Sequence, residues 1–222
     1  MTSKRCFALL GPPASGKGTQ GRLLTERLGI AYLSTGAQLR REIEKGTALG
    51  LRAKVFLDAN QYVPDSLAIE LVQDWVGDHS NGWLLDGFPR SIPQAEAFCE
   101  ASLISATDQG AFPQATERES ELVIIHLSVP MEELRVRVST RRECKSCGAS
   151  TTSAHQVCPK CGSSELEARA DDSSEGFEKR LQAYQTLTIP ALEFLQQRTQ
   201  VITINGSGSR EEVAAAIAHQ IT

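Results

Sequence analysis

A glycine-rich segment between an apolar run and a helical pattern is the feature that most constrains the fold of this chain. The segment GPPASGKGTQ, residues 11–20, follows the apolar run 6–10 and precedes an amphipathic stretch. Glycines let successive backbone N–H groups turn inward, and the N-terminus of the following helix adds partial positive charge. The spacing Gly11-x-x-x-x-Gly16-Lys17 therefore predicts a phosphate-binding loop, or P-loop, in which Lys17 supplies a full charge.

The hydroxyl residue of this loop is displaced from its usual position. The general pattern has serine or threonine directly after the lysine, whereas here Gly18 intervenes and the hydroxyl comes at Thr19. The shift indicates a subgroup of P-loop proteins. A glycine-rich turn that merely joins a strand to a helix is the alternative interpretation of the segment.

A second motif, the run DGFPR at residues 86–90, weakens that alternative. It closes another apolar run, and the carboxyl ends of parallel strands meet at one edge of a sheet. A carboxylate at Asp86 can hold the hydration shell of a nucleotide's Mg²⁺, and the guanidinium of Arg90 can bind a second phosphate. A strand end followed by a proline turn is the alternative here.

Short apolar runs recur along the chain and are separated by amphipathic stretches. The runs are 6–10, 31–33, 83–85, 122–127 and 201–204. This alternation predicts an α/β protein: a three-layer P-loop fold with a central five-stranded parallel sheet covered by helices on both faces. The stretch 177–197 predicts a helix bent at Pro190, and 210–219 predicts a closing helix capped by Ser209. The polar stretch 103–120 is expected to be a surface loop.

Bulk properties exclude several classes of protein. The 222 residues suffice for one α/β domain with small appended lobes. A net charge of −4 disfavours a protein that coats nucleic acid. No apolar stretch approaches the length of a membrane span, and the N-terminus lacks the features of an export signal. We therefore expect a cytoplasmic protein that binds neither nucleic acid nor a membrane.

Four of the six cysteines form two C-x-x-C pairs, Cys144 with Cys147 and Cys158 with Cys161. Two tight turns can bring four thiolates to the corners of a tetrahedron, which predicts a structural Zn²⁺ site without an open coordination position. Redox-active or unpaired cysteines are the alternative. His155 lies between the pairs and, with four thiols available, is expected to face solvent.

Five motifs occur in the order in which they occur in adenylate kinases, and on these motifs the chain resembles that family, a branch of the nucleoside monophosphate kinases, over nearly its whole length. The motifs are GPPASGKGTQ (11–20), STGAQLRR (34–41), LLDGFPRSIPQA (84–95), RVSTRRECKSC (137–147) and RADDSSEGFEKR (169–180). The resemblance implies reversible phosphoryl transfer from MgATP to AMP, giving two ADP, by a monomeric enzyme.

The resemblance also implies three parts. A P-loop core comprises residues 1–33, 64–136 and 177–222, an AMP-binding lobe comprises 34–63, and a lid with the zinc site comprises 137–176. The lid resembles the zinc-bearing lid of many bacterial adenylate kinases, although the gap between its cysteine pairs is shorter than usual.

The resemblance further implies the roles of individual residues. The catalytic group is Lys17, Arg90, Arg141, Arg169 and Arg180. The ATP site is Gly11, Ala14, Ser15, Gly16, Lys17, Gly18, Thr19, Arg137, Arg141 and Gly208, with Arg137 stacking on adenine. The AMP site is Thr35, Arg40, Gln61, Tyr62, Val63, Gly87, Phe88, Arg90, Gln94, Arg169 and Arg180, and Asp86 holds Mg²⁺ through water. Arginines suit this chemistry because their planar forks bind phosphate at two points, and the anionic AMP phosphate needs no general base.

Residues around the AMP base favour adenine. The Gln94 amide can accept from an exocyclic amine and donate to a ring nitrogen, and by resemblance Thr35 disfavours pyrimidines. Three positions depart from the usual family pattern: Ala14 stands where many relatives have glycine, Ala37 where many have aspartate, and Gln61 where a basic residue is frequent. The first two departures predict differences in loop conformation and local hydrogen bonding, and neither removes a phosphate contact.

Three alternatives compete with this interpretation. A kinase for UMP or CMP is one, and Thr35 and Gln94 disfavour it. A nucleic-acid-binding zinc ribbon on a P-loop ATPase is another, but residues 144–176 carry three basic and five acidic side chains. A GTPase is the third, and no guanine-reading N-K-x-D run occurs. The roles of Asp171 and Asp172, which could bond a ribose or the lid backbone or could cap the following helix, stay open.

Overall fold

The computed structural model describes residues 4–59, 61–79, 81–103, 120–169 and 172–221. Its centre is a parallel sheet made of β1 (Lys4–Leu10), β2 (Ala31–Ser34), β3 (Trp83–Asp86), β4 (Ser120–Ser128) and β8 (Gln200–Asn205). The strand order is β2-β3-β1-β4-β8, so the P-loop follows the middle strand. In register, Leu9 of β1 lies beside Asp86 of β3 and Ile125 of β4. The predicted five-stranded parallel sheet is confirmed.

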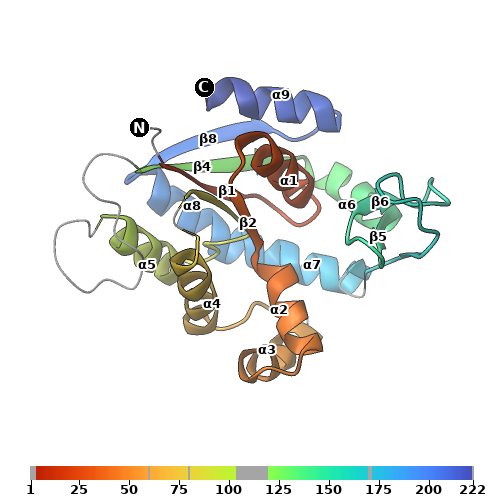
Figure 1. Ribbon diagram of the computed structural model, residues 1–222, viewed down its shortest axis with the longest axis horizontal. Helices are drawn as coiled ribbons and strands as arrows, with labels where there is room; N and C mark the ends of the chain where they lie inside the picture. The colour runs from red at the N-terminus through yellow and green to blue at the C-terminus, as the bar shows by residue number, and fades with distance from the viewer. Residues whose placement is uncertain (1–3, 60, 80, 104–119, 170–171, 222) are drawn as a thin grey trace.

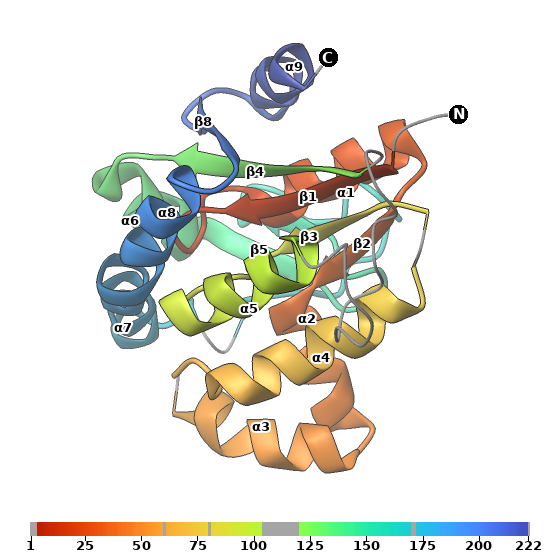
Figure 2. The same ribbon diagram turned by 90° about the vertical axis from the view of Figure 1, so that its left-hand side faces the viewer.

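Helices cover both faces of this sheet (Figure 1). One face carries α1 (Lys17–Leu28) and α9 (Arg210–Gln220), and the other carries α4 (Asp65–Gly77), α5 (Ile92–Leu103) and α8 (Ile189–Gln196), which Figure 2 shows side by side. The alternation of side chains along β1 produces the two apolar layers. Phe7 and Leu9 pack under α1 and α9, whereas Ala8 and Leu10 pack under α4, α5 and α8.

The helix predicted over 177–197 is divided into three parts. It consists of α7 (Ser174–Ala183), a π-helical turn (Tyr184–Thr188) and α8. Proline lacks a backbone N–H, and its ring clashes with the carbonyl four residues earlier, so Pro190 opens the turn that precedes it. Together with α6 (Met131–Thr140), α7 encloses a separate apolar cluster that includes Leu134 and Phe177.

The last helix begins as predicted. Ser209 caps α9, and its hydroxyl accepts from the backbone N–H of Glu212 while the Glu212 carboxylate accepts from the backbone N–H of Ser209. The start of α9 is therefore fixed on the face of the sheet that also carries α1.

The lobe predicted over 34–63 contains α2 (Thr35–Glu44) and α3 (Ala48–Asp58), which project from the central layers (Figure 1). The two helices approach closely at Gly50, where a Cβ would lie 2.1 Å from the carbonyl oxygen of Glu42. Leu39 of α2 and Ala53 of α3 share an apolar cluster with Leu67 and Leu71 of α4. The lobe therefore rests on α4 through this cluster.

The segment predicted to form the lid contains a second, antiparallel sheet. Its strands are β5 (Arg141–Cys144), β6 (Ser150–Thr152) and β7 (Leu166–Glu167), in the order β6-β5-β7. Within 141–169, the buried side chains are those of Cys144, Thr151 and Cys158. This part of the lid therefore has no apolar core of its own.

Some predictions cannot be compared with the structure. The surface loop expected over 103–120 falls, except for its ends, outside the described residues, and so does Asp171. Among the helices that the structure describes, none has both the length and the apolar character that crossing a bilayer requires.

Candidate active site

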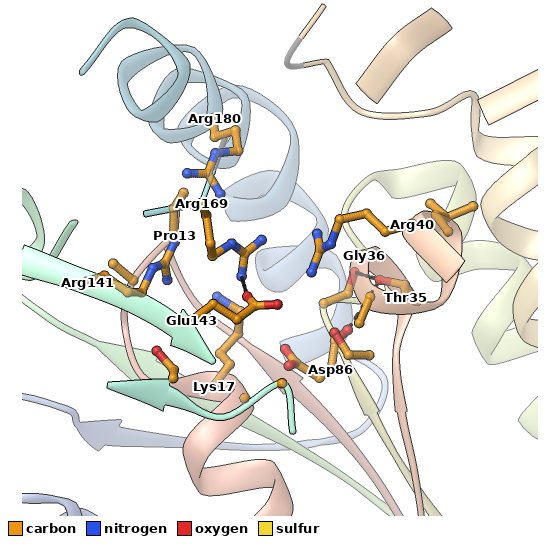
Figure 3. A pocket seen from close by; sticks show the side chains of 18 of the residues that line it. Pro13, Lys17, Thr35, Gly36, Arg40, Asp86, Arg141, Glu143, Arg169 and Arg180 are labelled. Atoms are coloured by element: carbon orange, nitrogen blue, oxygen red, sulfur yellow. Dashed lines mark hydrogen bonds and ion pairs between the residues drawn. The ribbon is translucent and has the colours of Figure 1, made fainter. Parts of the chain in front are cut away.

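The described residues enclose a large cleft at the carboxyl ends of β1, β2 and β3. Its volume is about 1380 Å³, and it lies between the P-loop, the lobe of α2 and α3, and the lid (Figure 3). Of the side chains described there, ten are lysine or arginine and five are aspartate or glutamate. This excess of positive charge suits a polyanionic ligand.

The cleft brings together the predicted nucleotide-site residues from segments far apart in the sequence. Its lining includes Gly11, Ala14, Ser15, Gly16, Lys17, Gly18 and Thr19 of the P-loop; Thr35, Arg40, Gln61, Tyr62 and Val63 of the small lobe; Asp86, Gly87, Phe88, Arg90 and Gln94 after β3; and Arg137, Arg141, Arg169 and Arg180. Gly208 lies outside this lining, beside Glu212 at the start of α9. Two residues earlier, the carbonyl of Gly206 accepts from Arg137 at 2.7 Å.

The P-loop folds around the amine of Lys17. Gly11 has φ 148°, and a Cβ there would lie 2.7 Å from the carbonyl oxygen of Leu127, so a larger residue does not fit. The Nζ of Lys17 donates to the carbonyl oxygens of Gly11 at 2.8 Å and Pro12 at 2.7 Å. The amine is thereby held at the mouth of the loop.

The pKa of Lys17 reports which charges surround its amine. Burial is the largest cause that lowers this pKa, to about 7. Asp86 opposes the shift, whereas Arg90, Arg141 and Arg180 add to it. Charges from β3, the turn after it, the lid and α7 therefore converge on the P-loop lysine.

Asp86 is held at the end of β3 beside the start of α1. Its carboxylate accepts from the hydroxyl of Tyr32 at 2.7 Å, and this carboxylate together with burial raises the pKa of Tyr32. A Cβ on Gly18 would lie 3.5 Å from Asp86 Oδ2, so the glycine at this position leaves space beside the carboxylate.

The guanidinium groups of Arg40 and Arg90 meet at the start of α2. A Cβ on Gly36 would lie 3.6 Å from Arg40 Nη1 and 3.9 Å from Arg90 Nη2. Arg90 is fixed by the carbonyl of Gly87, which accepts from its Nε, and by the ring of Tyr62, whose centroid lies 4.7 Å from its Cζ. Two cations beside a helix N-terminus form an anion-binding geometry.

The buried carboxylate of Asp172 orients two further arginines. It accepts from both Nε and Nη2 of Arg141, the Nε contact being 2.7 Å, and from Nη2 of Arg180 at 3.0 Å. The Asp172 side chain is 3% exposed. The helix-cap role that the sequence left open for this residue is wrong, because Ser173 caps α7 by accepting from the N–H of Gly176.

Gln94 is anchored while keeping part of its amide available. Its Oε1 accepts from the backbone N–H of Arg90 at 2.8 Å, and its Nε2 donates to Asp65 at 2.7 Å. A carboxamide offers two donors and two acceptor lone pairs. One donor and one lone pair therefore remain for a ligand, which is the pair that the edge of an adenine needs.

The four cysteines of the lid form one cluster. Their sulfur atoms lie within 4.8 Å of one another, with Cys144 to Cys161 at 3.6 Å and Cys147 to Cys158 at 3.7 Å. Four Zn–S bonds of 2.3 Å in a tetrahedron would separate the sulfurs by about 3.8 Å, so the donor set fits a closed metal site. His155 is exposed and lies outside the cluster, as expected.

Backbone groups support thiolates at two of these cysteines. Burial opposes ionisation of Cys144, but N–H groups of Ser146 and Cys147 that point to its sulfur, with neighbouring thiols, lower its pKa to about 6. Burial likewise opposes ionisation of Cys158, whose pKa is lowered by backbone N–H groups of the residues after it. In each C-x-x-C turn, backbone N–H groups therefore favour the thiolate form of one cysteine, which is the form that binds a metal.

The sequence did not reveal the residues that orient or contact the predicted site residues. Tyr32 orients Asp86, Asp65 orients Gln94, and Glu143 lies 3.5 Å from Arg169. Strand alternation could have identified Glu143, because it lies two residues from Arg141 on β5. Nothing in the local sequence links Tyr32 or Asp65 to partners that lie across the fold.

Comparisons with known proteins agree with this geometry. A family profile described as adenylate kinase matches residues 9–200. A protein named adenylate kinase from Methanocella arvoryzae is 40% identical over 220 residues, which cover 95% of each chain. Proteins of that name from Clostridium tetani and Carboxydothermus hydrogenoformans are 38% and 37% identical, with 92% and 94% of this chain and 93% and 95% of theirs aligned.

Proposed function

The chain belongs to the adenylate kinase family and transfers a phosphoryl group from ATP to AMP, and we propose that its cleft does so by holding the two nucleotides end to end. The observation that carries this proposal is the convergence of cations from the P-loop, the turn after β3, the lid and α7 on one cleft. An oxygen of the AMP phosphate attacks the γ-phosphorus of ATP. The bond to the β,γ-bridging oxygen breaks, and two ADP result.

The donor half of the cleft is the P-loop with the lid. The backbone N–H groups of residues 11–19 and the start of α1 bind the triphosphate, and the amine of Lys17 pairs with the negative charge of the phosphates. Arg137 lies beside Gly16 and Gly206, which supports the stacking of its guanidinium on the ATP adenine. Gly208 remains a proposed contact of that base.

The acceptor half is the lobe of α2 and α3 with the turn after β3. Arg40 and Arg90 bind the AMP phosphate at the start of α2, and the remaining donor and acceptor of Gln94 read the adenine. Thr35 is fixed beneath the base because its hydroxyl donates toward the carbonyl oxygens of Asp86 and Gly87, each at 3.2 Å. Residues 61–63 line the same end of the cleft.

Phosphoryl transfer needs positioning and charge neutralisation more than proton transfer. The transferring group carries negative charge on its equatorial oxygens, and Arg141, Arg169 and Arg180 with Lys17 and Arg90 neutralise it. Asp172 presents two of these guanidiniums in fixed orientations. Closure of the lid over both substrates excludes water and so prevents hydrolysis of ATP.

Two metal ions complete the proposal. Asp86, oriented by Tyr32, would hold the water shell of Mg²⁺, which supplies charge neutralisation on the triphosphate. The four lid thiolates would hold Zn²⁺, which supplies structural stability rather than chemistry because no coordination position is left open.

We propose that the enzyme consists of three parts. The core consists of residues 1–33, 64–136 and 177–222, the AMP lobe of 34–63 and the lid of 137–176. We expect a cytoplasmic monomer whose partners are its nucleotide substrates, without nucleic acid or membrane.

The test is to measure ADP formation by the purified protein with MgATP and, separately, AMP, UMP, CMP or GMP. We expect kcat/KM to be clearly highest with AMP because of the anchored Gln94. Equal turnover of UMP would refute the adenine assignment, and no turnover with any monophosphate would refute the function.

A further inference from the structure

A carboxylate lies inside a cleft that must accept polyanions. Glu143 lines the cleft together with Arg141, and Figure 3 shows its side chain among the cations near Lys17. The period of two along β5 explains this position: Arg141 and Glu143 face the cleft, whereas Arg142 does not line it. Glu143 is therefore presented to the site by the same strand that presents a phosphate-binding arginine.

The partner of this carboxylate is another cation of the reaction. Glu143 Oε2 lies 3.5 Å from Nη1 of Arg169, and the side chains are 36% and 22% exposed. The dashed line in Figure 3 marks this pair, and it directs the Arg169 guanidinium toward the centre of the cleft. A phosphate that binds Arg169 would compete with this carboxylate for the guanidinium.

We infer that Glu143 is a counter-ion that substrate displaces: it pairs with the Arg169 guanidinium before a nucleotide binds and releases it when a nucleotide phosphate binds there. This inference rests on the proposed function, because it takes a nucleotide phosphate as the ligand of Arg169. Glu143 acts through Arg169 and is therefore a positioning residue, not a catalytic one.

The energetic consequence is a modest weakening of nucleotide binding. A partly exposed ion pair contributes up to about 1 kcal/mol, and binding must give up this contribution. Once displaced, the carboxylate also repels the bound phosphate across a partly desolvated space. Removal of the charge should therefore tighten binding about two- to fivefold and slow product release, so that KM falls while kcat stays equal or decreases.

The experiment compares Glu143→Gln with the unchanged enzyme by isothermal titration with MgATP, AMP and adenosine. Adenosine has no phosphate, so its affinity should not change, whereas both phosphorylated ligands should bind more tightly to the variant. Raising the salt concentration should reduce the difference, because the effect is electrostatic.

The matched control is Glu178→Gln. It removes the same charge from a pair with Arg135 at 3.0 Å whose side chains are 50% and 42% exposed and which does not line the cleft. Its nucleotide affinities should equal those of the unchanged enzyme. Metal content and melting temperature of Glu143→Gln must match those of the unchanged enzyme, because the neighbouring residue is Cys144.

Equal or weaker binding of MgATP and AMP by Glu143→Gln would overturn the inference, as would an equal gain for adenosine. These outcomes are separate from the proposed function. That function fails only if the unchanged enzyme forms no ADP from ATP and AMP, whatever the ratio of affinities.

Discussion

Within the described part of the chain, Ala14 is the non-glycine residue with left-handed backbone, at φ 64°. This conformation costs an L-residue about 1 kcal/mol because its Cβ approaches the carbonyl oxygen. The methyl group of Ala14 packs against the apolar cluster of α6 and α7, which offsets part of that cost. Alanine here adopts a backbone geometry that glycine would adopt without strain, and the difference in loop conformation expected from the sequence stays a prediction.

Substitutions at Ala14 test this conformation. Ala14→Val should lower the free energy of unfolding by about 2 kcal/mol, because a β-branched residue tolerates φ above zero poorly. Ala14→Gly should change it by less than about 1 kcal/mol, since relief of strain is offset by the entropy of glycine in the unfolded chain. Urea denaturation measures both values. Ala214→Val in α9 is the control, and an equal cost at the two sites would contradict the strain at Ala14.

The lowered pKa of Lys17 predicts proton uptake on nucleotide binding. With a pKa of about 7, the amine is mostly neutral at pH 8 in the empty cleft, and the triphosphate charge raises the pKa again. Binding of MgATP at pH 8 should therefore take up about one proton, and binding at pH 6 almost none. Calorimetry in buffers of different ionisation enthalpy measures this number.

Proton uptake by Lys17 also determines how the affinity for MgATP depends on pH. Binding should weaken as the pH rises above 7, because the protonated amine is the form that the phosphates favour. Lys17→Gln should abolish the uptake, whereas Lys179→Gln, at an exposed pair with Glu175, should leave it unchanged. Uptake that persisted in Lys17→Gln would assign the proton to another group.

Individual site residues were predictable where a short motif contains them. Lys17, Arg90 and Arg141 each stand in a run whose neighbours define their place at a strand end or helix start, and all three line the cleft. Asp172 and Tyr32 act through partners that lie 31 and 54 residues away, and such pairings depend on tertiary structure. The local sequence therefore indicated the groups proposed to touch phosphate better than the groups that orient them.

Among the elements, the proposed lid is the one that a metal ion would stabilise most. Within residues 141–169 the buried side chains are those of Cys144, Thr151 and Cys158, and two of these are cysteines of the proposed metal site. Because no apolar core replaces them, a structural metal would contribute most of the lid's stability, and apparent zinc affinities in small domains reach about 10 kcal/mol. Loss of the ion should disorganise Arg141 and Arg169 together.

Metal removal tests this dependence. Treatment with a chelator, or the change Cys144→Ser, should reduce kcat at least about tenfold while far-UV circular dichroism of the core stays nearly unchanged. Added Zn²⁺ should restore the chelated enzyme. Cys6→Ser, in the core, is the control and should keep its metal; full activity of the metal-depleted enzyme would contradict a structural role for the ion.

Strands were more predictable than the interruption between α7 and α8. β1, β3 and β4 contain short apolar runs that are buried on both faces, so composition alone identifies them, whereas β8 alternates buried and exposed residues. The π-helical turn at Tyr184–Thr188 has no such signature, because it depends on where Pro190 removes a hydrogen bond and on packing around Tyr184. The sequence therefore predicted a bend caused by Pro190 but did not predict that the bend is a π-helical turn.

At the scale of the whole molecule, the fold gathers cations at one edge of the central sheet. The parallel sheet brings the ends of β1, β2 and β3 together, and the two projecting parts add arginines from both sides (Figures 1 and 3). The order of motifs allowed this arrangement to be predicted. The relation between Glu143 and Arg169 could not be, because it depends on the pairing of β5 with β7, in which Glu143 lies opposite Glu167.

The central claim is that these cations bind two nucleotides end to end, and a mimic with two adenosines joined by five phosphates tests it most directly. Isothermal titration should give one mimic per protein, bound at least about a hundredfold more tightly than ATP, because both halves of the cleft are occupied by one molecule. An affinity equal to that of ATP, or two mimics per protein, would contradict the claim.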